Sequence, residues 1–473
     1  MLSADSLNKT ELPETPFDNG HLVKRGEILG NLCKKLSKSI SYCVIDDEMW
    51  IWNHDNQTIF KLNPNAKKIV FNYLSGKELD IESLNFIKNE LSGVFDSDLF
   101  EVAEDDTSLD ANATDSFYAF SFLRKLAMER HVPLFPALEL LYLCNYDCIH
   151  CYRPQERPDL MSLDRWKGVI SELKDEGTLG VVLTGGEVTA WKHIKELITY
   201  IRSMRMAFVF KTNGHLIDQE WVDFLVESRC HEVHISLYGS DRESNDYVTQ
   251  RKGSYDRIVN AIRSCAEAGL KVRISSSLTE KTFPHYQKII DLAKELEVGL
   301  NIDPMLSPSA SVKINTKAIR INQQQIRHFC DGLGDTLAPE FQTLRAPGAP
   351  VCSAARSNCS IAPNGNVYPC VGYWYKEETI SILNSSFKSA WANSPILNTV
   401  RKITNDKLPT CSQCKFREFC PRCLGAGYEE TGNLYGISPN NCAVAEGVYE
   451  NYQNRKPTKT SVGLGGSFGN RCS

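Results

Sequence analysis

Three cysteines fall within a span of eight residues, directly after a short apolar run. Cys144, Cys148 and Cys151 follow the spacing C-x₃-C-x₂-C in LYLCNYDCIHCYRP, residues 141–154. Four thiolates would ligate every iron of a cubane iron–sulfur cluster, so three thiolates leave one iron open. An open metal position is where chemistry takes place, and a small molecule with an amine and a carboxylate could chelate it. The spacing therefore predicts a reactive cluster, although such a triplet alone could also be part of a structural zinc site.

A second group of eight cysteines lies in the last third of the chain. Its members are Cys352, Cys359, Cys370, Cys411, Cys414, Cys420, Cys423 and Cys442. Eight thiols are enough to ligate two further 4Fe–4S clusters completely. The run C-x₂-C-x₅-C-x₂-C within this group would also suit a zinc ribbon or knuckle, so zinc stays open as the alternative metal.

Seventeen cysteines in a chain of 473 residues are unusual. Disulfide-dense proteins are usually small and exported. Here the amino terminus lacks the basic and apolar segments of an export signal, and no run is long enough to span a membrane. We therefore expect a cytoplasmic protein whose clustered cysteines bind metal. Six scattered cysteines are expected to be buried or idle thiols: Cys33, Cys43, Cys230, Cys265, Cys330 and Cys472.

The composition excludes one class of partner. The net charge is −5, with 42% hydrophobic and 23% charged residues. These fractions are ordinary for a globular protein, and the negative charge gives no reason to expect binding to nucleic acid.

The cysteine triplet closes the first of six strand-like runs between residues 136 and 306. Each run is separated from the next by a helical pattern, which predicts parallel strands with crossover helices. The strands are apolar almost throughout, so both faces of the sheet should be covered. Six such units suit an α/β fold built as a partial (β/α)₆ barrel of the TIM type, whose functional residues lie at the carboxyl ends of the strands.

The remaining segments differ in composition. Residues 41–62 contain three short strand-like runs, helical spacing follows them, and residues 101–116 are acidic and polar. Beyond residue 306, Cys, Gly and Pro interrupt the pattern. We expect an arm at 1–40, a small α+β domain at 41–100, a linker at 101–130, the barrel at 131–306, a cysteine-rich domain at 307–455 and a flexible tail at 456–473.

A C-x₃-C-x₂-C triplet that closes the first strand of a partial barrel resembles the radical S-adenosylmethionine (SAM) superfamily. In that family the methionine end of SAM caps the open iron, and one electron from the cluster cleaves the sulfonium. The resulting 5′-deoxyadenosyl radical takes a hydrogen atom from the substrate. The resemblance implies that Cys144, Cys148 and Cys151 hold a catalytic 4Fe–4S cluster.

Other strand ends extend the resemblance to SAM contacts. The turn Thr184-Gly185-Gly186-Glu187 is similar to the GGEP motif that meets the SAM amino group, with Val188 in place of the proline. Glycines allow close backbone approach, and the Glu187 carboxylate can accept from an ammonium.

Three further positions match residues that bind SAM in the family. Asn213 and Ser236 end the third and fourth strands, where relatives hydrogen-bond the ribose or the carboxylate. His150 stands where the family favours an aromatic residue near the adenine. The segment NDYVTQR at 245–251 resembles an HDxxR motif, with Thr249 in the arginine place and Arg251 as its substitute.

The second cysteine group is similar to the SPASM extension of radical SAM enzymes that modify peptides and proteins. The resemblance implies two fully ligated auxiliary 4Fe–4S clusters, and hence three clusters in all, with an electron-transfer role for the auxiliary pair. One would be bound by Cys352, Cys359, Cys370 and Cys423, and the other by Cys411, Cys414, Cys420 and Cys442.

Two features of the sequence restrict the class of substrate. Sulfatase maturases carry a general-base Asp after the cysteine that matches Cys370, but here that residue is Val371. The small domain at 41–100 resembles the winged-helix domain with which peptide maturases bind a leader segment, by adding a strand to a sheet edge.

We therefore expect a radical SAM oxidoreductase that acts on a ribosomally made peptide. The modification would be oxidative, such as a thioether or carbon–carbon crosslink, and a flavodoxin or ferredoxin would donate electrons. Two alternatives stay open: a maturase of a protein side chain, of the sulfatase or quinohemoprotein type, and a non-catalytic, zinc-dependent peptide-binding scaffold.

Overall fold

The computed structural model describes most of the chain from residue 116 to residue 454 and short stretches before it. The described residues are 40–46, 48–54, 58–62, 68–70, 72, 116–153, 160–309, 311, 314–332, 346–373 and 379–454. The chain divides into two compact units, one of Met1–Ser37 with Leu62–Ala111 and one of Lys38–Lys61 with Asn112–Ser473. The predicted arm, the helices expected after residue 62, the linker up to residue 115 and the tail lie wholly or largely outside the described residues. All features below belong to the second unit.

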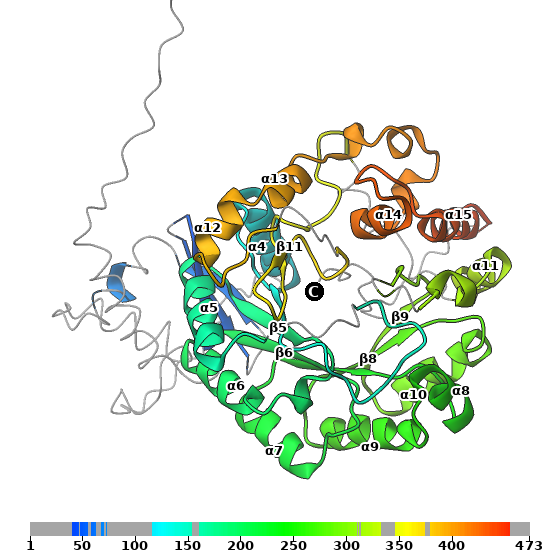
Figure 1. Ribbon diagram of the computed structural model, residues 1–473, viewed down its shortest axis with the longest axis horizontal. Helices are drawn as coiled ribbons and strands as arrows, with labels where there is room; N and C mark the ends of the chain where they lie inside the picture. Colours follow the sequence, from blue (N-terminus) through cyan, green and yellow to red (C-terminus); the bar gives the residue numbers. More distant parts are fainter. Residues whose placement is uncertain are drawn as a thin grey trace, which may run out of the picture. The chain divides into compact units, whose positions relative to one another are not determined.

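Six parallel strands form the centre of this unit (Figure 1). They are β4 (Ala137–Glu139), β5 (Gly180–Thr184), β6 (Ala207–Thr212), β7 (Glu232–Ser236), β8 (Val272–Ser277) and β9 (Gly299–Asp303). Strands that are neighbours in sequence are neighbours in the sheet. This order and the helices between the strands confirm the predicted partial (β/α)₆ barrel.

Helices cover one face of the curved sheet (Figure 1). They are α5 (Leu163–Asp175), α6 (Ile194–Ser203), α7 (Gln219–Glu227), α8 (Arg242–Thr249), α9 (Ser254–Glu267) and α10 (Tyr286–Glu295). Side chains such as Ser162 and Asp218 begin these helices by accepting from backbone N–H groups in the first turn. Only α8 was not expected from the sequence, because its segment is short and polar.

The two faces of the sheet are packed differently. On the helix side Val181, Leu183 and Phe208 are fully buried in one large apolar core. On the inner side, Ala137 and Val182 belong to a separate small cluster with Val209 and Val371. Because Val371 comes from the cysteine-rich region, that region covers the inner face of the barrel at β4, β5 and β6.

The cysteine-rich region is joined directly to the barrel sheet. Strand β10 (Ser360–Ile361) pairs parallel with β4, and β11 (Val367–Tyr368) pairs antiparallel with β10, so the sheet has eight strands. β10 and β11 form a hairpin with Asn364 and Gly365 in its turn, where Gly365 has a φ of 80°. The helices of this region are α11 (Gln323–Gly332), α12 (Phe387–Asn393), α13 (Pro395–Arg401), α14 (Leu424–Thr431) and α15 (Pro439–Asn454).

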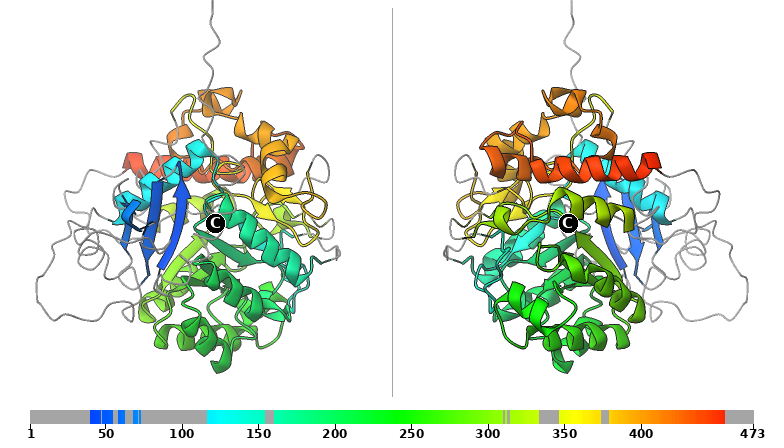
Figure 2. Two further views of the ribbon diagram at one scale, coloured as in Figure 1. Left: turned by 90° about the vertical axis from the view of Figure 1, so that its left-hand side faces the viewer. Right: turned by 90° about the vertical axis from the view of Figure 1, so that its right-hand side faces the viewer.

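A small sheet packs against the barrel beside helix α4 (Ser116–Arg130) (Figure 2). Its strands are β1 (Ile40–Ile45), β2 (Glu48–Asn53) and β3 (Thr58–Leu62), in that order. Trp50 and Trp52 share an apolar cluster with Leu123 and Ala127 of α4 and with Ala207 of the barrel. The contact lies at the amino-terminal ends of the barrel strands, opposite the cysteine triplet.

Two expectations need correction. The predicted linker at 101–130 is wrong for residues 116–130, because these form α4 and bury Leu123 and Ala127 completely. Because the stretch before residue 116 is acidic and polar, the sequence pattern favoured a linker over this apolar helix. The three strands of the expected separate domain at 41–100 belong, up to Lys61, to the same compact unit as the barrel.

The length and polarity of the helices bear on whether the chain could span a membrane. In the part of the chain that the structure describes, every helix is too short or too polar to cross a bilayer.

Candidate active site

The loop that carries the three cysteines is anchored by its own backbone. Asp147 and Ile149 donate to carbonyl groups of α8, and the second bond measures 3.0 Å, to Val248 O. The hydroxyl of Ser309 donates to Cys151 O at 2.7 Å. The loop is thereby fixed to two neighbouring segments at the carboxyl end of the sheet, as the sequence pattern predicted.

The Gly-Gly-Glu turn after β5 lies directly against the start of this loop. Gly186 N donates to Leu141 O at 2.6 Å, and Glu187 N donates to Leu143 O at 2.9 Å. A Cβ atom on Gly186 would lie 1.8 Å from Leu143 O, and Gly185 has a φ of 138°. Both positions therefore require glycine, one for close approach and one for its backbone conformation.

The Glu187 side chain is fully buried, and among the described residues its carboxylate accepts hydrogen bonds from three neighbours. Its Oε1 accepts from the N–H and hydroxyl of Thr189 and from the hydroxyl of Thr212 at 2.6 Å. Its Oε2 accepts from Asn213 N at 2.7 Å. The carboxylate thus ties the end of β5 to the end of β6, and its expected contact with an ammonium stays a prediction.

Asn213 connects this frame to the first cysteine. Its Nδ2 donates to Asn145 Oδ1 at 2.6 Å and lies 3.8 Å from Cys144 Sγ. The Nδ2 atom of Asn145 is itself buried without a hydrogen-bond partner among the described residues. Sequence reasoning missed Asn145, and its place beside the first cysteine was the signal that could have identified it. An unpaired buried donor next to the cysteines suits a site that receives a polar ligand.

His150 and Ser236 meet through Tyr238. The rings of His150 and Tyr238 are edge-on, with centroids 4.3 Å apart, and the side chains of Tyr238 and Ser236 are hydrogen-bonded. Burial lowers the pKa of His150 to about 4, so the ring is neutral near pH 7. Its Nδ1 is buried and has no partner in the described part of the chain. A neutral, flat ring with an unused nitrogen fits the expected neighbour of an adenine.

The segment NDYVTQR is mainly structural in its first five residues. Asn245 is fully buried and accepts from Tyr238 N at 3.0 Å, Asp246 accepts from Gly253 N at 2.6 Å, and Thr249 is buried in α8. Arg251 is exposed after the end of this helix. Its expected contact with SAM stays a prediction.

Burial raises the pKa values of two of the triplet thiols, Cys144 and Cys148. The pKa of Cys148 is raised by burial and then by its neighbours Cys144 and Cys151, and that of Cys144 is raised mainly by burial. Three thiolates at this position require a compensating cation, which a bound metal supplies.

A cavity of about 260 Å³ lies in the cysteine-rich region. Four of its lining residues are the expected set Cys411, Cys414, Cys420 and Cys442. These thiols face one space although they are separated by as many as 31 positions in sequence, from 411 to 442. Their arrangement around a cavity suits a cubane, which takes one thiolate on each iron.

In the other expected set of cysteine ligands, two sulfur atoms accept hydrogen bonds from backbone N–H groups. Gly372 N and Ala426 N each approach a thiol sulfur, Cys370 and Cys423, at 3.4 Å. Hydrogen bonds to ligand sulfur atoms are usual at iron–sulfur clusters and tune their potentials. Within the described ranges, however, no group of three or more His, Cys, Asp or Glu side chains is positioned to hold a metal ion. All metal-ligand assignments therefore stay predictions.

Comparison with known families adds sequence evidence to this geometry. Residues 138–293 match the radical SAM superfamily, and residues 352–415 match SPASM, an iron–sulfur cluster-binding domain. This chain is a radical SAM enzyme with a SPASM domain. Its cofactors are accordingly SAM and iron–sulfur clusters. The radical SAM match includes the cysteine triplet and every expected SAM contact, whereas Cys420, Cys423 and Cys442 lie beyond the SPASM match.

Two curated relatives of this radical SAM enzyme are similar over the same share of the chain. Mycofactocin maturase MftC of Mycobacterium tuberculosis is 27% identical over 327 residues, which cover 65% of this chain and 82% of the relative. The antilisterial bacteriocin subtilosin biosynthesis protein AlbA of Bacillus subtilis is 27% identical over 323 residues, covering 65% and 69%.

Solved structures support the fold of both domains. SuiB of Streptococcus suis, bound to S-adenosylmethionine, has a TM-score of 0.59 at 18% identity, with 86% of this chain and 99% of that chain covered. The protein anSMEcpe with bound AdoMet has a TM-score of 0.56 at 16% identity, covering 68% and 93%.

Three of the four scattered cysteines that the structure describes agree with expectation, whereas Cys230 is only partly buried. Cys43, Cys265 and Cys330 are buried, and burial raises the pKa of each thiol to about 12. Such thiols are unreactive near neutral pH. Cys33 and Cys472 lie outside the described residues.

Proposed function

We propose that this enzyme modifies a ribosomally made peptide by radical chemistry and installs an oxidative change such as a thioether or carbon–carbon crosslink. The observation that carries the proposal is the cysteine triplet fixed against the Gly-Gly-Glu turn and Asn213. The two curated relatives support the peptide substrate, because one is a maturase and the other a bacteriocin biosynthesis protein.

The catalytic centre in this proposal uses Cys144, Cys148 and Cys151 as ligands of one 4Fe–4S cluster. When bound, the cluster and SAM together supply the 5′-deoxyadenosyl radical. The protein's part is positioning. Gly185 and Gly186 let the turn pack against the cysteine loop, where its backbone would meet the amino end of SAM, and the buried Glu187 ties that turn to the end of β6.

The nucleoside end of SAM would be bound by residues from the next two strand ends. Asn213 and Ser236 offer hydrogen bonds to the ribose or the carboxylate, and the neutral ring of His150 offers a face to the adenine. Arg251 is the predicted cationic contact. The inner face of the barrel, covered by the SPASM region, would keep water and other C–H bonds away from the radical.

Two auxiliary 4Fe–4S clusters complete the proposal, for three clusters in all. Cys352, Cys359, Cys370 and Cys423 would bind one, and Cys411, Cys414, Cys420 and Cys442 the other. A crosslink removes two hydrogens from the peptide, one as an atom and one as a proton with loss of an electron. That electron needs an acceptor, and the eight thiols offer ligands for two.

The small sheet is the proposed site for the leader segment of the peptide. In the described residues β3 has a neighbouring strand on only one side, so an extended peptide could pair with its other edge. This contact is at the opposite end of the strands from the triplet. The peptide would therefore run along the barrel from its leader to its reactive residues.

Modification of a protein side chain is the second candidate, and one observation argues against its sulfatase form. Val371 stands where sulfatase maturases carry a general-base Asp, and it packs against Ala137 and Val182 on the inner face. An aliphatic residue there can neither accept a proton nor bind a polar group.

Anaerobic reconstitution with iron and sulfide tests the proposal. With dithionite and SAM, the protein should release 5′-deoxyadenosine, detected by chromatography with mass spectrometry, and carry about twelve irons for three clusters of four. Stoichiometric zinc without 5′-deoxyadenosine would instead support the non-catalytic scaffold and overturn the proposal.

A further inference from the structure

The four-thiol cavity opens beside an unusual group of basic side chains. Lys402, Lys407, Lys415 and Arg417 are all exposed and will be called the basic rim. Arg417 lines the cavity, and Lys407 and Lys415 each lie between two residues that line it. Lys407 Nζ also donates to Lys402 O at 3.0 Å, which brings the fourth member to the same edge.

The basic rim has a positive balance within an acidic chain. Asp406 and Glu418 are the exposed carboxylates of the same segment, so four cations and two carboxylates give a net charge of +2, against −5 for the whole chain. One oxygen of Asp406 already accepts from Gly348 N at 2.8 Å. None of the four cations forms an ion pair with a residue that the structure describes. Their charges are therefore available to a partner.

The four thiols of this cavity are more accessible as a set than those of the other auxiliary set, because none of them is buried. Cys442 is exposed, whereas Cys359 and Cys370 of the other auxiliary set are buried. Electron transfer between two proteins requires one redox centre close to the surface of each, since the rate falls steeply with distance. Of the two auxiliary sets, this one offers the shorter route to a partner.

We infer that the basic rim docks an acidic one-electron carrier protein and that the electron passes through the four-thiol cavity. The inference rests on the proposed function, because it assumes a cluster bound by Cys411, Cys414, Cys420 and Cys442. The carrier loses one electron and the cluster gains it, and no bond or proton is exchanged. The electron then passes to the cluster at the triplet, so the auxiliary cluster is oxidised again and can accept the electron that the peptide loses.

Charge complementarity and size favour a carrier over a tightly bound partner. Electron-transfer complexes are weak and bury little surface, commonly under about 1,200 Å² in total, so a small charged rim around one opening is sufficient. Opposite charges on two such surfaces raise the association rate by about 10- to 1,000-fold, and salt suppresses the effect.

The salt dependence of the wild-type protein is the first test. The reconstituted enzyme would be mixed with reduced plant-type ferredoxin, an acidic carrier, and cluster reduction followed by stopped-flow absorbance. Between about 20 mM and 300 mM salt the second-order rate constant should fall about tenfold or more. A rate constant that does not change with salt would overturn the inference without any variant.

Charge reversal is the second test. Lys402, Lys407 and Lys415 do not line the cavity, so replacing all three by Glu should leave the iron content and dithionite-driven release of 5′-deoxyadenosine unchanged. Reduction by ferredoxin at low salt should slow about tenfold or more and lose its salt dependence. Equal rates for variant and wild type would overturn docking at this rim.

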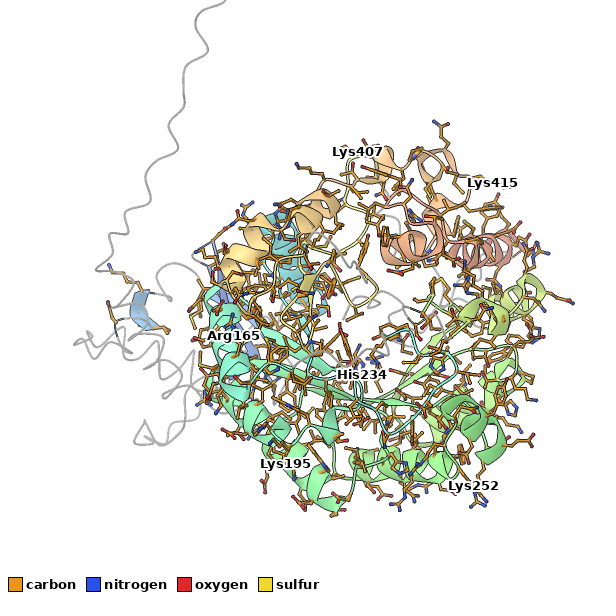
Figure 3. All side chains as sticks on the ribbon, viewed as in Figure 1. Arg165, Lys195, His234, Lys252, Lys407 and Lys415 are labelled. Carbon is orange, nitrogen blue, oxygen red and sulfur yellow. The ribbon has the colours of Figure 1, made fainter. Side chains whose placement is uncertain are left out.

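The control is a charge-matched triple on the barrel, with two lysines on α10 and one in the turn between α8 and α9. Lys252, Lys288 and Lys294 are exposed, and Figure 3 shows Lys252 on the opposite side of the molecule from Lys407 and Lys415. Their replacement by Glu should change the ferredoxin rate by less than about twofold, and an equal slowing would mean that only total charge matters. If dithionite and SAM yield no 5′-deoxyadenosine from wild-type protein, the proposed function fails, whereas a normal dithionite reaction with no effect of the rim overturns docking alone.

Discussion

The cysteine triplet and the four-thiol cavity present sulfur atoms on very different supports. The triplet loop is bound to α8 and to the Gly-Gly-Glu turn by backbone hydrogen bonds between distant segments. At the cavity, Cys411 and Cys420 lie in or directly after helical turns of only three residues. Backbone bonds there are mostly local, as from Cys414 N to Cys411 O at 3.2 Å.

The difference indicates where order depends on metal. A loop bonded to a parallel sheet keeps its shape through the sheet, and its metal adds chemistry. A segment of short turns around a cavity has few tertiary bonds of its own and gains most of its local stability from the bound cluster. We therefore expect removal of a ligand to abolish chemistry at the first site and to loosen structure at the second.

The largest expected effect is on chemistry at the triplet. Cys148→Ala should reduce 5′-deoxyadenosine release by at least about 1,000-fold and remove about four irons, because the site-differentiated cluster loses a ligand. The thermal midpoint should move by only a few degrees, measured by calorimetry under anaerobic conditions. A variant that still releases the nucleoside at the wild-type rate would contradict the assignment of the triplet.

A large structural effect is expected at the cavity. Cys414→Ala should increase backbone hydrogen exchange in residues 405–423 about 100-fold, as measured by mass spectrometry, because a cluster no longer crosslinks these turns. Cys148→Ala serves as the matched control and should leave exchange in the same peptides unchanged. Equal protection in both variants would remove the contrast between the two regions.

A moderate effect is expected when the close approach at the triplet is disturbed. Gly186→Ala would place a Cβ atom 1.8 Å from Leu143 O, so the turn and the cysteine loop must separate. SAM affinity of the iron-loaded protein, measured by equilibrium dialysis, should weaken about tenfold or more.

The control for that glycine lies in α5. Gly168→Ala adds a Cβ that meets only the tip of the Arg165 side chain, at 3.1 Å, and alanine favours a helix by about 1 kcal/mol. SAM affinity should stay at the wild-type value. Loss of affinity in both variants would mean that the close approach is not what matters.

The smallest effect is a pH dependence confined to the barrel side. Burial, as the largest cause, lowers the pKa of His54 to about 2 and of His231 to about 3, and both rings pack against Trp52. Residues 352–454 contain no histidine.

The direction in which stability changes with pH follows from the unfolded chain, in which histidine binds a proton below about pH 6.5. Folded, these rings stay neutral, so stability is full above that pH and is lost as the pH falls, by about 2 kcal/mol at pH 5 for His231. Hydrogen exchange should rise in residues 40–62 between pH 7 and pH 5, and His231→Gln should weaken this dependence. A rise of equal size at the cavity would contradict the explanation.

The sequence was sufficient for the barrel because its signals are regular. Six apolar strand-like runs alternate with helical patterns and four of the strand ends carry motifs, so the tertiary structure follows directly from this pattern. The same regularity placed Asn213 and Ser236 at one edge of the sheet. By contrast, α4 was missed because its helical pattern follows an acidic stretch that is typical of a linker.

Hydrogen bonds between segments that are distant in sequence could not be predicted from the sequence. Nothing in the motif around Glu187 indicates that its carboxylate would accept hydrogen bonds from Thr189, Thr212 and Asn213. The bond from Asn213 to Asn145 likewise joins two loops that only the folded sheet brings together. Motif spacing therefore identified the participants, while their hydrogen-bond partners depended on the three-dimensional register.

The pairing of β10 with β4 limits how this enzyme can be divided. Ala137 N donates to Cys359 O at 2.8 Å, so the backbone of the SPASM region completes the strand that leads into the cysteine triplet. A shortened chain that ends before residue 352 would leave that edge of the sheet bare, and bare edges pair with other chains. Excision of the auxiliary region should thus yield insoluble aggregates, not a smaller soluble radical enzyme.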